Sequence, residues 1–196
     1  MNLPNRLTMA RIVMVPLFMV LFLWNFPFHY VLSGLVFGAA ALTDFFDGKI
    51  ARERNLITNF GKFVDPIADK MLTTAAFIGL CAIGKMSPWA LLIIMTREFA
   101  VTSVRLLAAT DGNVIAANFW GKLKTVMQFV AILFSVAALE FSTWQGSLLS
   151  SFSLPAAVFS VPLIVGEVLV WVSAVLTLLS GVEYVWANRR YFAGEK

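Results

Sequence analysis

The sequence predicts an all-α integral membrane protein, in which residues 1–196 form a single domain of six transmembrane helices. Hydrophobic residues make up 60% of the chain and the mean hydropathy is +0.83, whereas soluble domains are about 45–50% apolar. Apolar runs recur along the whole chain, and lysine and arginine are distributed unevenly among the loops between them. These three observations exclude an ordinary soluble protein.

Six apolar runs carry the transmembrane prediction. A helix needs about 20 residues to cross the hydrocarbon core, so six spans use roughly 120 residues and leave only short loops. Several runs are shorter than a full span, and we expect polar, inward-facing positions to extend them. The runs cover residues 9–28, 30–42, 71–83, 89–96, 129–139 and 161–179.

The basic residues indicate how these helices are oriented. With six spans and the N-terminus inside, fourteen of the fifteen lysines and arginines fall on or toward the cytoplasmic side, and only Lys85 falls outside. Because cytoplasmic loops carry an excess of such residues, we expect a multi-pass protein of the cell (inner or plasma) membrane with both termini in the cytoplasm. The net charge of +4 then reflects topology and anionic headgroups, and we expect no nucleic-acid partner.

The first span has a polar start that allows two interpretations. Asn5 or Thr8 would cap the helix, or this turn would help to hold a nucleotide at the cytoplasmic interface. The span ends in aromatic residues, which are typical of a membrane interface. His29 falls in the loop that follows, where we expect it to be solvated.

The second span leads to a concentration of acidic residues. Four aspartates lie within 26 residues of a chain in which only 13% are charged, although a carboxylate near a bilayer is costly without a counter-charge. Asp44 and Asp47 are three residues apart and Asp65 and Asp69 are four apart, which places each pair on one helix face. Four oxygen donors from two adjacent helix ends suit hard divalent cations such as Mg²⁺ or Mn²⁺.

The aspartates belong to a longer pattern of fixed spacing. It contains, in order, Asp44, Asp47-Gly48, Ala51-Arg52, Gly61, Asp65 and Asp69. This string resembles the signature of the CDP-alcohol phosphotransferase family, and the resemblance covers nearly the whole chain. It implies that family's fold and a catalytic domain whose active site faces the cytoplasm.

The resemblance also implies roles for individual residues. Two divalent cations, Mg²⁺ or Mn²⁺, would be bound by Asp44, Asp47, Asp65 and Asp69. Asp69 would in addition be the catalytic general base toward an acceptor alcohol. The donor would be CDP-diacylglycerol, with CMP as the leaving group. Contacts to this donor would come from Asn5, Gly48, Arg52 and Thr58.

Structural interpretations exist for two members of the pattern. Arg52 alone would be explained as a positive-inside anchor of the helix. Asp65 alone would be explained as an N-cap, with Pro66 at the first helical position. Neither interpretation accounts for Asp69, one turn further along, so we favour the metal site.

The fourth and fifth spans carry a second group of charges. The group consists of Arg97, Arg105, Lys122 and Lys124. A neutral acceptor needs fewer cations, whereas a dianionic phosphate on the acceptor would suit them. Arg97 and Arg105 lie within about 80° of each other on a helix, but Lys122 and Lys124 point nearly opposite ways. A structural account instead pairs Arg97 with Glu98 or an aspartate and leaves Arg105 among headgroups.

This basic segment resembles the branch of the family that uses glycerol 3-phosphate. We therefore expect transfer of the phosphatidyl group to glycerol 3-phosphate, giving phosphatidylglycerophosphate, an anionic phospholipid, and CMP. The alternatives are the branch that uses inositol phosphate, another CDP-diacylglycerol-dependent transferase, and an ion or phosphate transporter. Transport predicts polar residues spread across the membrane, whereas here they crowd the cytoplasmic third. Small residues in the spans permit a homodimer among the surrounding membrane lipids.

Overall fold

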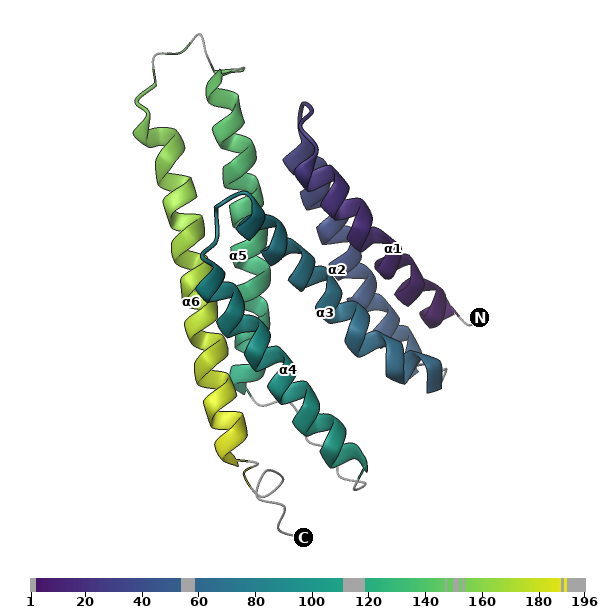
Figure 1. Ribbon diagram of the computed structural model, residues 1–196. Coiled ribbons are helices and arrows are strands. Elements are labelled where there is room, and N and C mark those ends of the chain that lie inside the picture. Colours follow the sequence, from purple (N-terminus) through teal and green to yellow (C-terminus); the bar gives the residue numbers. More distant parts are fainter. Residues whose placement is uncertain are drawn as a thin grey trace.

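Six long α-helices and one short 3₁₀-helix make up the part of the chain that the computed structural model describes (Figure 1). That part is residues 3–53, 59–110, 119–146, 148–149, 152, 154–187 and 189, without the side chains of 3–5, 44–53, 59–66, 69, 106–107 and 109–110. These ranges contain no strand, so the all-α prediction is confirmed for them. The elements are α1 (Leu3–Leu23), α2 (His29–Glu53), α3 (Asn59–Ala82), α4 (Pro88–Thr110), α5 (Phe119–Thr143), η1 (Trp144–Gly146) and α6 (Ala157–Ala187).

Each predicted apolar run falls within one helix, except that the first run passes the end of α1 and the third passes the end of α3 by one residue. α1 ends at Leu23 rather than at residue 28, and the chain then turns through a segment that contains Pro27, which has no backbone N–H to continue a helix. Phe28 adopts a positive φ of 62° in this turn. The later helices are longer than their apolar runs because polar residues continue them; α5, for example, begins at Phe119 rather than at residue 129.

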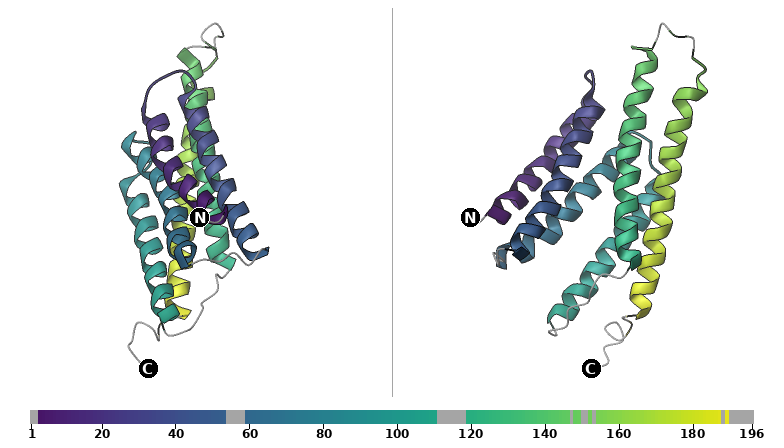
Figure 2. Two further views of the ribbon diagram at one scale, coloured as in Figure 1. Left: turned by 90° about the vertical axis from the view of Figure 1, so that its right-hand side faces the viewer. Right: turned by 180° about the vertical axis from the view of Figure 1, so that it is seen from behind.

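The helices form two groups that stand side by side (Figures 1 and 2). α1 packs along α2 and α3, and α6 packs along α5 and α4, while contacts between α2 and α5 join the groups. Aromatic rings fill much of the first group: the Phe18 centroid lies 5.5 Å from that of Phe22 and 5.8 Å from that of Phe37. The ring of Phe129 from α5 continues this cluster, 5.5 Å from Phe37. Such pairs add to the stabilisation from burying the rings.

The alternating direction of the helices brings distant segments to one end of the molecule. In Figure 1, helices α1, α3 and α5 run upward and α2, α4 and α6 run downward, so that the first three begin, and the last three end, at their lower ends. This arrangement follows because short connections join neighbouring helices. The segments that carry the predicted aspartates and basic residues therefore share one end.

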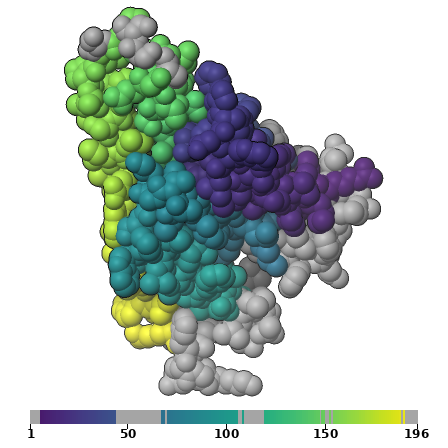
Figure 3. Space-filling model, turned by 45° about the horizontal axis from the view of Figure 1, so that its top comes forward, coloured from purple at the N-terminus to yellow at the C-terminus, as the bar shows by residue number. Residues whose placement is uncertain are grey.

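The prediction for His29 was wrong. This residue begins α2 and is only 6% exposed, with its ring centroid 3.9 Å from that of Tyr30 and 5.7 Å from that of Phe26. The turn between α1 and α2 borders the far end of α5, as the space-filling view shows (Figure 3). Packing against α5 excludes the solvent that the sequence led us to expect.

The surface of the helices fits a membrane environment. Large apolar side chains are exposed along α6, including Val161, Ile164, Val168 and Val175, which is unusual for a soluble protein. Among the described residues, three helices contain segments long and apolar enough to cross a membrane, Arg6–Leu23, Phe119–Gly146 and Ala157–Ala187. Shorter apolar helical segments cover His29–Thr43 and Lys70–Ala82. The number of six spans and the orientation of the termini stay predictions.

Candidate functional site

The four predicted metal ligands lie on two consecutive helices. Asp44 and Asp47 belong to the last three turns of α2, and Asp65 and Asp69 to the first three turns of α3. The end of α2 and the start of α3 lie together at the lower end of Figure 1. Thr58 lies outside the described residues. For seven other predicted site residues the structure describes the backbone but not the side chain: Asn5, Asp44, Asp47, Gly48, Arg52, Asp65 and Asp69.

This donor set fits the predicted divalent cations chemically. Carboxylate oxygens are preferred ligands of Mg²⁺ and Mn²⁺, and Mg²⁺ is commonly bound by one or two carboxylates together with substrate phosphates. Within the described part of the chain, no group of three or more His, Cys, Asp or Glu side chains is arranged to hold a metal ion. The assignment of the four aspartates as ligands stays a prediction.

A polar cavity of about 370 Å³ lies between α3, α4 and α5. All four residues predicted to bind the acceptor phosphate line it: Arg97, Arg105, Lys122 and Lys124. Lys70, which directly follows Asp69 in α3, also lines the cavity. The structure therefore gathers five basic side chains from three helices around one space, next in sequence to a predicted metal ligand.

Glu98 lies among these basic side chains. Its carboxylate forms ion pairs with Lys124, with Lys70 (Nζ to Oε2, 3.5 Å) and with Arg97 (Nη1 to Oε1, 3.4 Å). Lys70 Nζ also donates a hydrogen bond of 3.0 Å to the Glu98 backbone carbonyl and another to Thr102 Oγ1. Because a carboxylate that loses most of its hydration requires compensation, the three cations offset the cost of burying Glu98 in this position. Arg97 therefore pairs with Glu98, as the structural account expected, and also lines the cavity, as the phosphate-binding account expected.

Arg97 is fixed by α6 as well as by Glu98. The side chain is buried, and its Nη2 donates a hydrogen bond of 2.8 Å to Ser180 Oγ. A Cβ atom built on Gly181 would lie only 2.6 Å from Arg97 Cγ, which is closer than carbon atoms approach. Glycine at position 181 thus leaves the room through which the Arg97 stem passes α6.

The other three predicted phosphate-binding residues differ in their surroundings. The Arg105 guanidinium is exposed and lies 5.4 Å from the centroid of the Tyr184 ring, a cation–π geometry. Lys122 is exposed, whereas Lys124 is 6% exposed and paired with Glu98. Their alternate positions on α5 explain the contrast, so Lys124 is the inner and Lys122 the outer lysine of the cavity.

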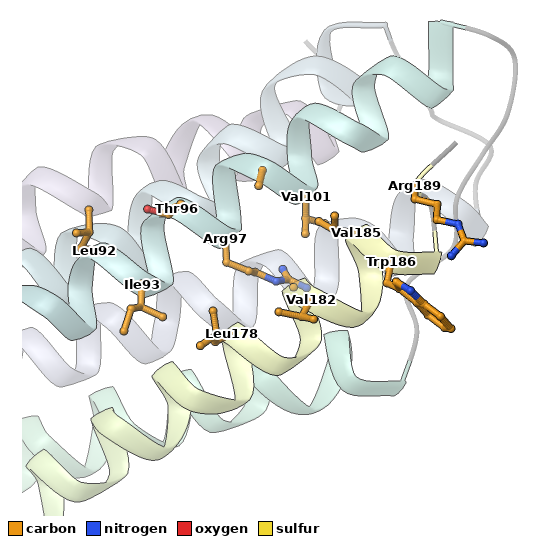
Figure 4. Close-up of a pocket in the computed structure, with 12 residues that line it drawn as sticks. Leu92, Ile93, Thr96, Arg97, Val101, Leu178, Val182, Val185, Trp186 and Arg189 are labelled. Atoms are coloured by element: carbon orange, nitrogen blue, oxygen red, sulfur yellow. The ribbon is translucent and has the colours of Figure 1, made fainter. Parts of the chain in front are cut away.

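An apolar groove of about 630 Å³ adjoins the polar cavity between α4 and α6 (Figure 4). Leu92 and Ile93 line one end, and Trp186 and Arg189 stand at the other. Arg97 lines both spaces and extends from α4 toward α6 (Figure 4). Its side chain therefore lies between the apolar groove and the polar cavity.

Several residues of this site were not predicted from the sequence. Glu98 was considered only as a partner of Arg97, and Lys70, Ser180 and Gly181 were assigned no place in the site. The signal for the last two was a serine beside a glycine near the end of a largely apolar segment, which also carries Ser173 and Thr177. That signal does not identify a partner on another helix.

The charge of the polar cavity suits a doubly negative ligand. Its described lining contains five cationic side chains and one carboxylate, Glu98. Guanidinium and ammonium groups bind phosphate through charge-assisted hydrogen bonds. A phosphate group entering the cavity would meet an excess of positive charge.

Comparisons with known proteins agree with this chemistry. Residues 1–179 match the sequence model of the CDP-alcohol phosphatidyltransferase family. A Bacillus subtilis (strain 168) protein named CDP-diacylglycerol–glycerol-3-phosphate 3-phosphatidyltransferase is 38% identical, over 95% of each chain. A protein of the same name from Rickettsia bellii is 37% identical over 97% of each chain. A Mycobacterium tuberculosis protein, named probable phosphatidylglycerophosphate synthase, is 41% identical over 98% of this chain and 84% of its own.

Proposed function

Because the chain belongs to the CDP-alcohol phosphatidyltransferase family, we propose that it transfers the phosphatidyl group of CDP-diacylglycerol to glycerol 3-phosphate. The products would be phosphatidylglycerophosphate and CMP. The cavity in which Arg97, Arg105, Lys122 and Lys124 meet carries this proposal, because a phosphorylated acceptor needs such a site and a neutral acceptor does not. The names of the relatives favour the same acceptor.

The four aspartates would hold two divalent cations beside this cavity. When bound, these cations would neutralise the diphosphate and the charge that develops on it during phosphoryl transfer. Asn5, Gly48, Arg52 and Thr58 would contact the donor.

Asp69 would accept the proton of the acceptor hydroxyl group. The freed oxygen then attacks the phosphorus that carries diacylglycerol, a new P–O bond forms, and the bond to the CMP oxygen breaks. Lys70 lies next to Asp69 in α3 and lines the cavity. This adjacency would keep the acceptor phosphate near the base.

The basic residues would act on the acceptor rather than on the chemistry itself. Arg97 and Lys124 would bind its phosphate from the inner side, where Glu98 and Ser180 orient them. Arg105 and Lys122, which are exposed, would close around it from the rim. Fixing the phosphate orients the hydroxyl for attack, which is how positioning lowers a reaction barrier.

The apolar surface and the charge asymmetry support an inner-membrane enzyme with six spans. Both termini and the active site would then face the cytoplasm, where fourteen of fifteen basic residues would lie. The lipid tails of the donor would remain in the bilayer while its headgroup reaches the aspartates.

An acceptor screen tests the proposal. Purified protein in detergent would receive CDP-diacylglycerol, Mg²⁺ and, separately, glycerol 3-phosphate, inositol phosphate, inositol or serine. We expect the release of CMP and the formation of a phosphorylated lipid only when the acceptor is glycerol 3-phosphate. Turnover with inositol phosphate and with no other acceptor would show that the chain belongs to the branch that uses inositol phosphate. Turnover only with serine or inositol would show that the cavity does not bind an acceptor phosphate.

A further inference from the structure

A third cavity lies at the opposite end of the molecule from the polar cavity between α3, α4 and α5. It has a volume of about 480 Å³ and is enclosed by the turn between α1 and α2 and by the end of α5 with η1. These segments border each other in the space-filling view (Figure 3). The function proposed above uses none of the residues around this cavity.

Two buried polar side chains line this cavity and retain atoms without a partner. Glu140 is 4% and His29 is 6% exposed. Glu140 Oε1 accepts hydrogen bonds from Trp144 Nε1 (3.2 Å) and Thr143 Oγ1 (3.5 Å). Among the described residues, none forms a hydrogen bond with Glu140 Oε2 or His29 Nδ1. A buried carboxyl oxygen without a partner is costly, and a donor or a cation beside it would compensate that cost.

Among the described residues, no lysine or arginine side chain lines the cavity beside Glu140, and no ion pair joins Glu140 to His29. The lining of the cavity contains neither lysine nor arginine, and residues 125–188 contain neither anywhere in the sequence. Lys85, the one basic residue expected at this end, is exposed in the connection between α3 and α4 and does not line the cavity. A counter-charge would therefore come from a ligand.

The walls of the cavity identify the type of cation. Phe26, Phe28 and Trp144 line it together with the His29 ring. Aromatic faces attract organic ammonium groups, and an aromatic wall with a carboxylate is a common way to recognise them. A bare metal cation would need several oxygen ligands, whereas the described lining offers a single carboxylate besides the neutral side-chain oxygens of Asn25 and Thr143.

We propose that this cavity binds an organic ammonium group, which pairs with Glu140 Oε2 against the aromatic wall. The group could belong to a small soluble amine or to the headgroup of an amine-containing lipid, because the cavity lies at an end of the molecule that borders the bilayer in the proposed topology. Both sources present the same chemistry to Glu140.

Choline and its uncharged isostere 3,3-dimethylbutan-1-ol are a matched pair of probes. The full chain, in a maltoside detergent that carries no amine, would be titrated with each while tryptophan fluorescence and the melting temperature are recorded. We expect a saturable response to choline only. In Glu140→Gln the apparent affinity should fall about tenfold or more, because a charge-assisted contact is lost, while the exposed Glu167→Gln control should match the wild type.

Further variants and a lipid arm complete the test. Phe26→Leu keeps the carboxylate but removes one ring, so it should also weaken choline binding if Glu140→Gln fails to fold. In nanodiscs, phosphatidylethanolamine should raise the melting temperature of the wild type more than that of Glu140→Gln if the ammonium group belongs to a lipid headgroup. If it belongs to a soluble amine, only free choline should produce this difference. Equal responses to choline and the isostere, no saturable response, or a wild-type response in both Glu140→Gln and Phe26→Leu would overturn the proposal.

Discussion

The Nη2 atom of Arg97 in α4 donates a hydrogen bond of 2.8 Å to Ser180 Oγ in α6, across 83 positions of sequence. Both groups are buried. On its other side Arg97 meets Glu98 and the basic cavity. An apolar helix that carries no predicted site residue thus orients a predicted acceptor-binding residue.

Ser180→Ala should weaken the use of glycerol 3-phosphate. Losing a hydrogen bond to a charged group corresponds to about a tenfold effect, so we expect KM for glycerol 3-phosphate to rise by about that factor with a smaller change in kcat. Steady-state assays of CMP release measure both. Ser173→Ala is the matched control, because Ser173 is buried in α6 and, among the described contacts, its hydroxyl donates only to the Val170 carbonyl within the same helix. Equal effects of the two changes would contradict a role for Ser180 in positioning Arg97.

Gly181→Ala should displace Arg97 rather than merely fill space. The added Cβ would meet Arg97 Cγ at 2.6 Å, so the Arg97 stem must move away from α6. We expect KM for glycerol 3-phosphate to rise and KM for CDP-diacylglycerol to stay near the wild-type value. Gly38→Ala is the control, since a Cβ at that position meets nothing within 4 Å. An unchanged acceptor KM in Gly181→Ala would show that Arg97 tolerates the displacement.

Glu98→Gln should destabilise the protein, and phosphate should compensate in part. Removing one partner of a largely buried ion pair leaves uncompensated charges, here on Lys70, Arg97 and Lys124. We expect a loss of up to about 3 kcal/mol, read as a lower melting temperature in detergent. Inorganic phosphate should raise the melting temperature of Glu98→Gln more than that of the wild type. The opposite order would argue against a phosphate site among these cations.

The two lysines of α5 should differ in their effect on stability. Lys124 is buried and paired with Glu98, whereas Lys122 is exposed. We expect Lys124→Met to lower the melting temperature clearly and Lys122→Met to change it little, because exposed charges contribute at most about 1 kcal/mol. Both changes should raise KM for glycerol 3-phosphate. Thermal unfolding and kinetics on the same preparations separate the two effects.

Asp69→Asn should abolish turnover without abolishing folding. If Asp69 both binds metal and accepts the proton, kcat should fall by roughly three powers of ten or more, as expected when residues acting as a unit are impaired. Chelation of divalent cations should have a comparable effect on the wild type. Glu167→Gln is the control carboxylate, exposed on α6. Substantial activity in Asp69→Asn would move the role of base to another residue.

The sequence by itself determined the helical class, the positions of the apolar runs and the spacing of the aspartates, because hydropathy and fixed intervals are local properties of the chain. It also selected Arg97, Arg105, Lys122 and Lys124 as one group, which the structure places around one cavity. Only the tertiary structure decided that Lys124 lies inside and Lys122 at the rim, and that Ser180 and Gly181 hold Arg97.

The physical reason is that these last relationships depend on how α6 packs against α4 and α5. That packing buries Arg97, and the contact of the turn between α1 and α2 with α5 buries His29 and Glu140, although each looks like an ordinary polar residue in its own segment. Burial and pairing arise from contacts between helices far apart in sequence, and no local pattern encodes them.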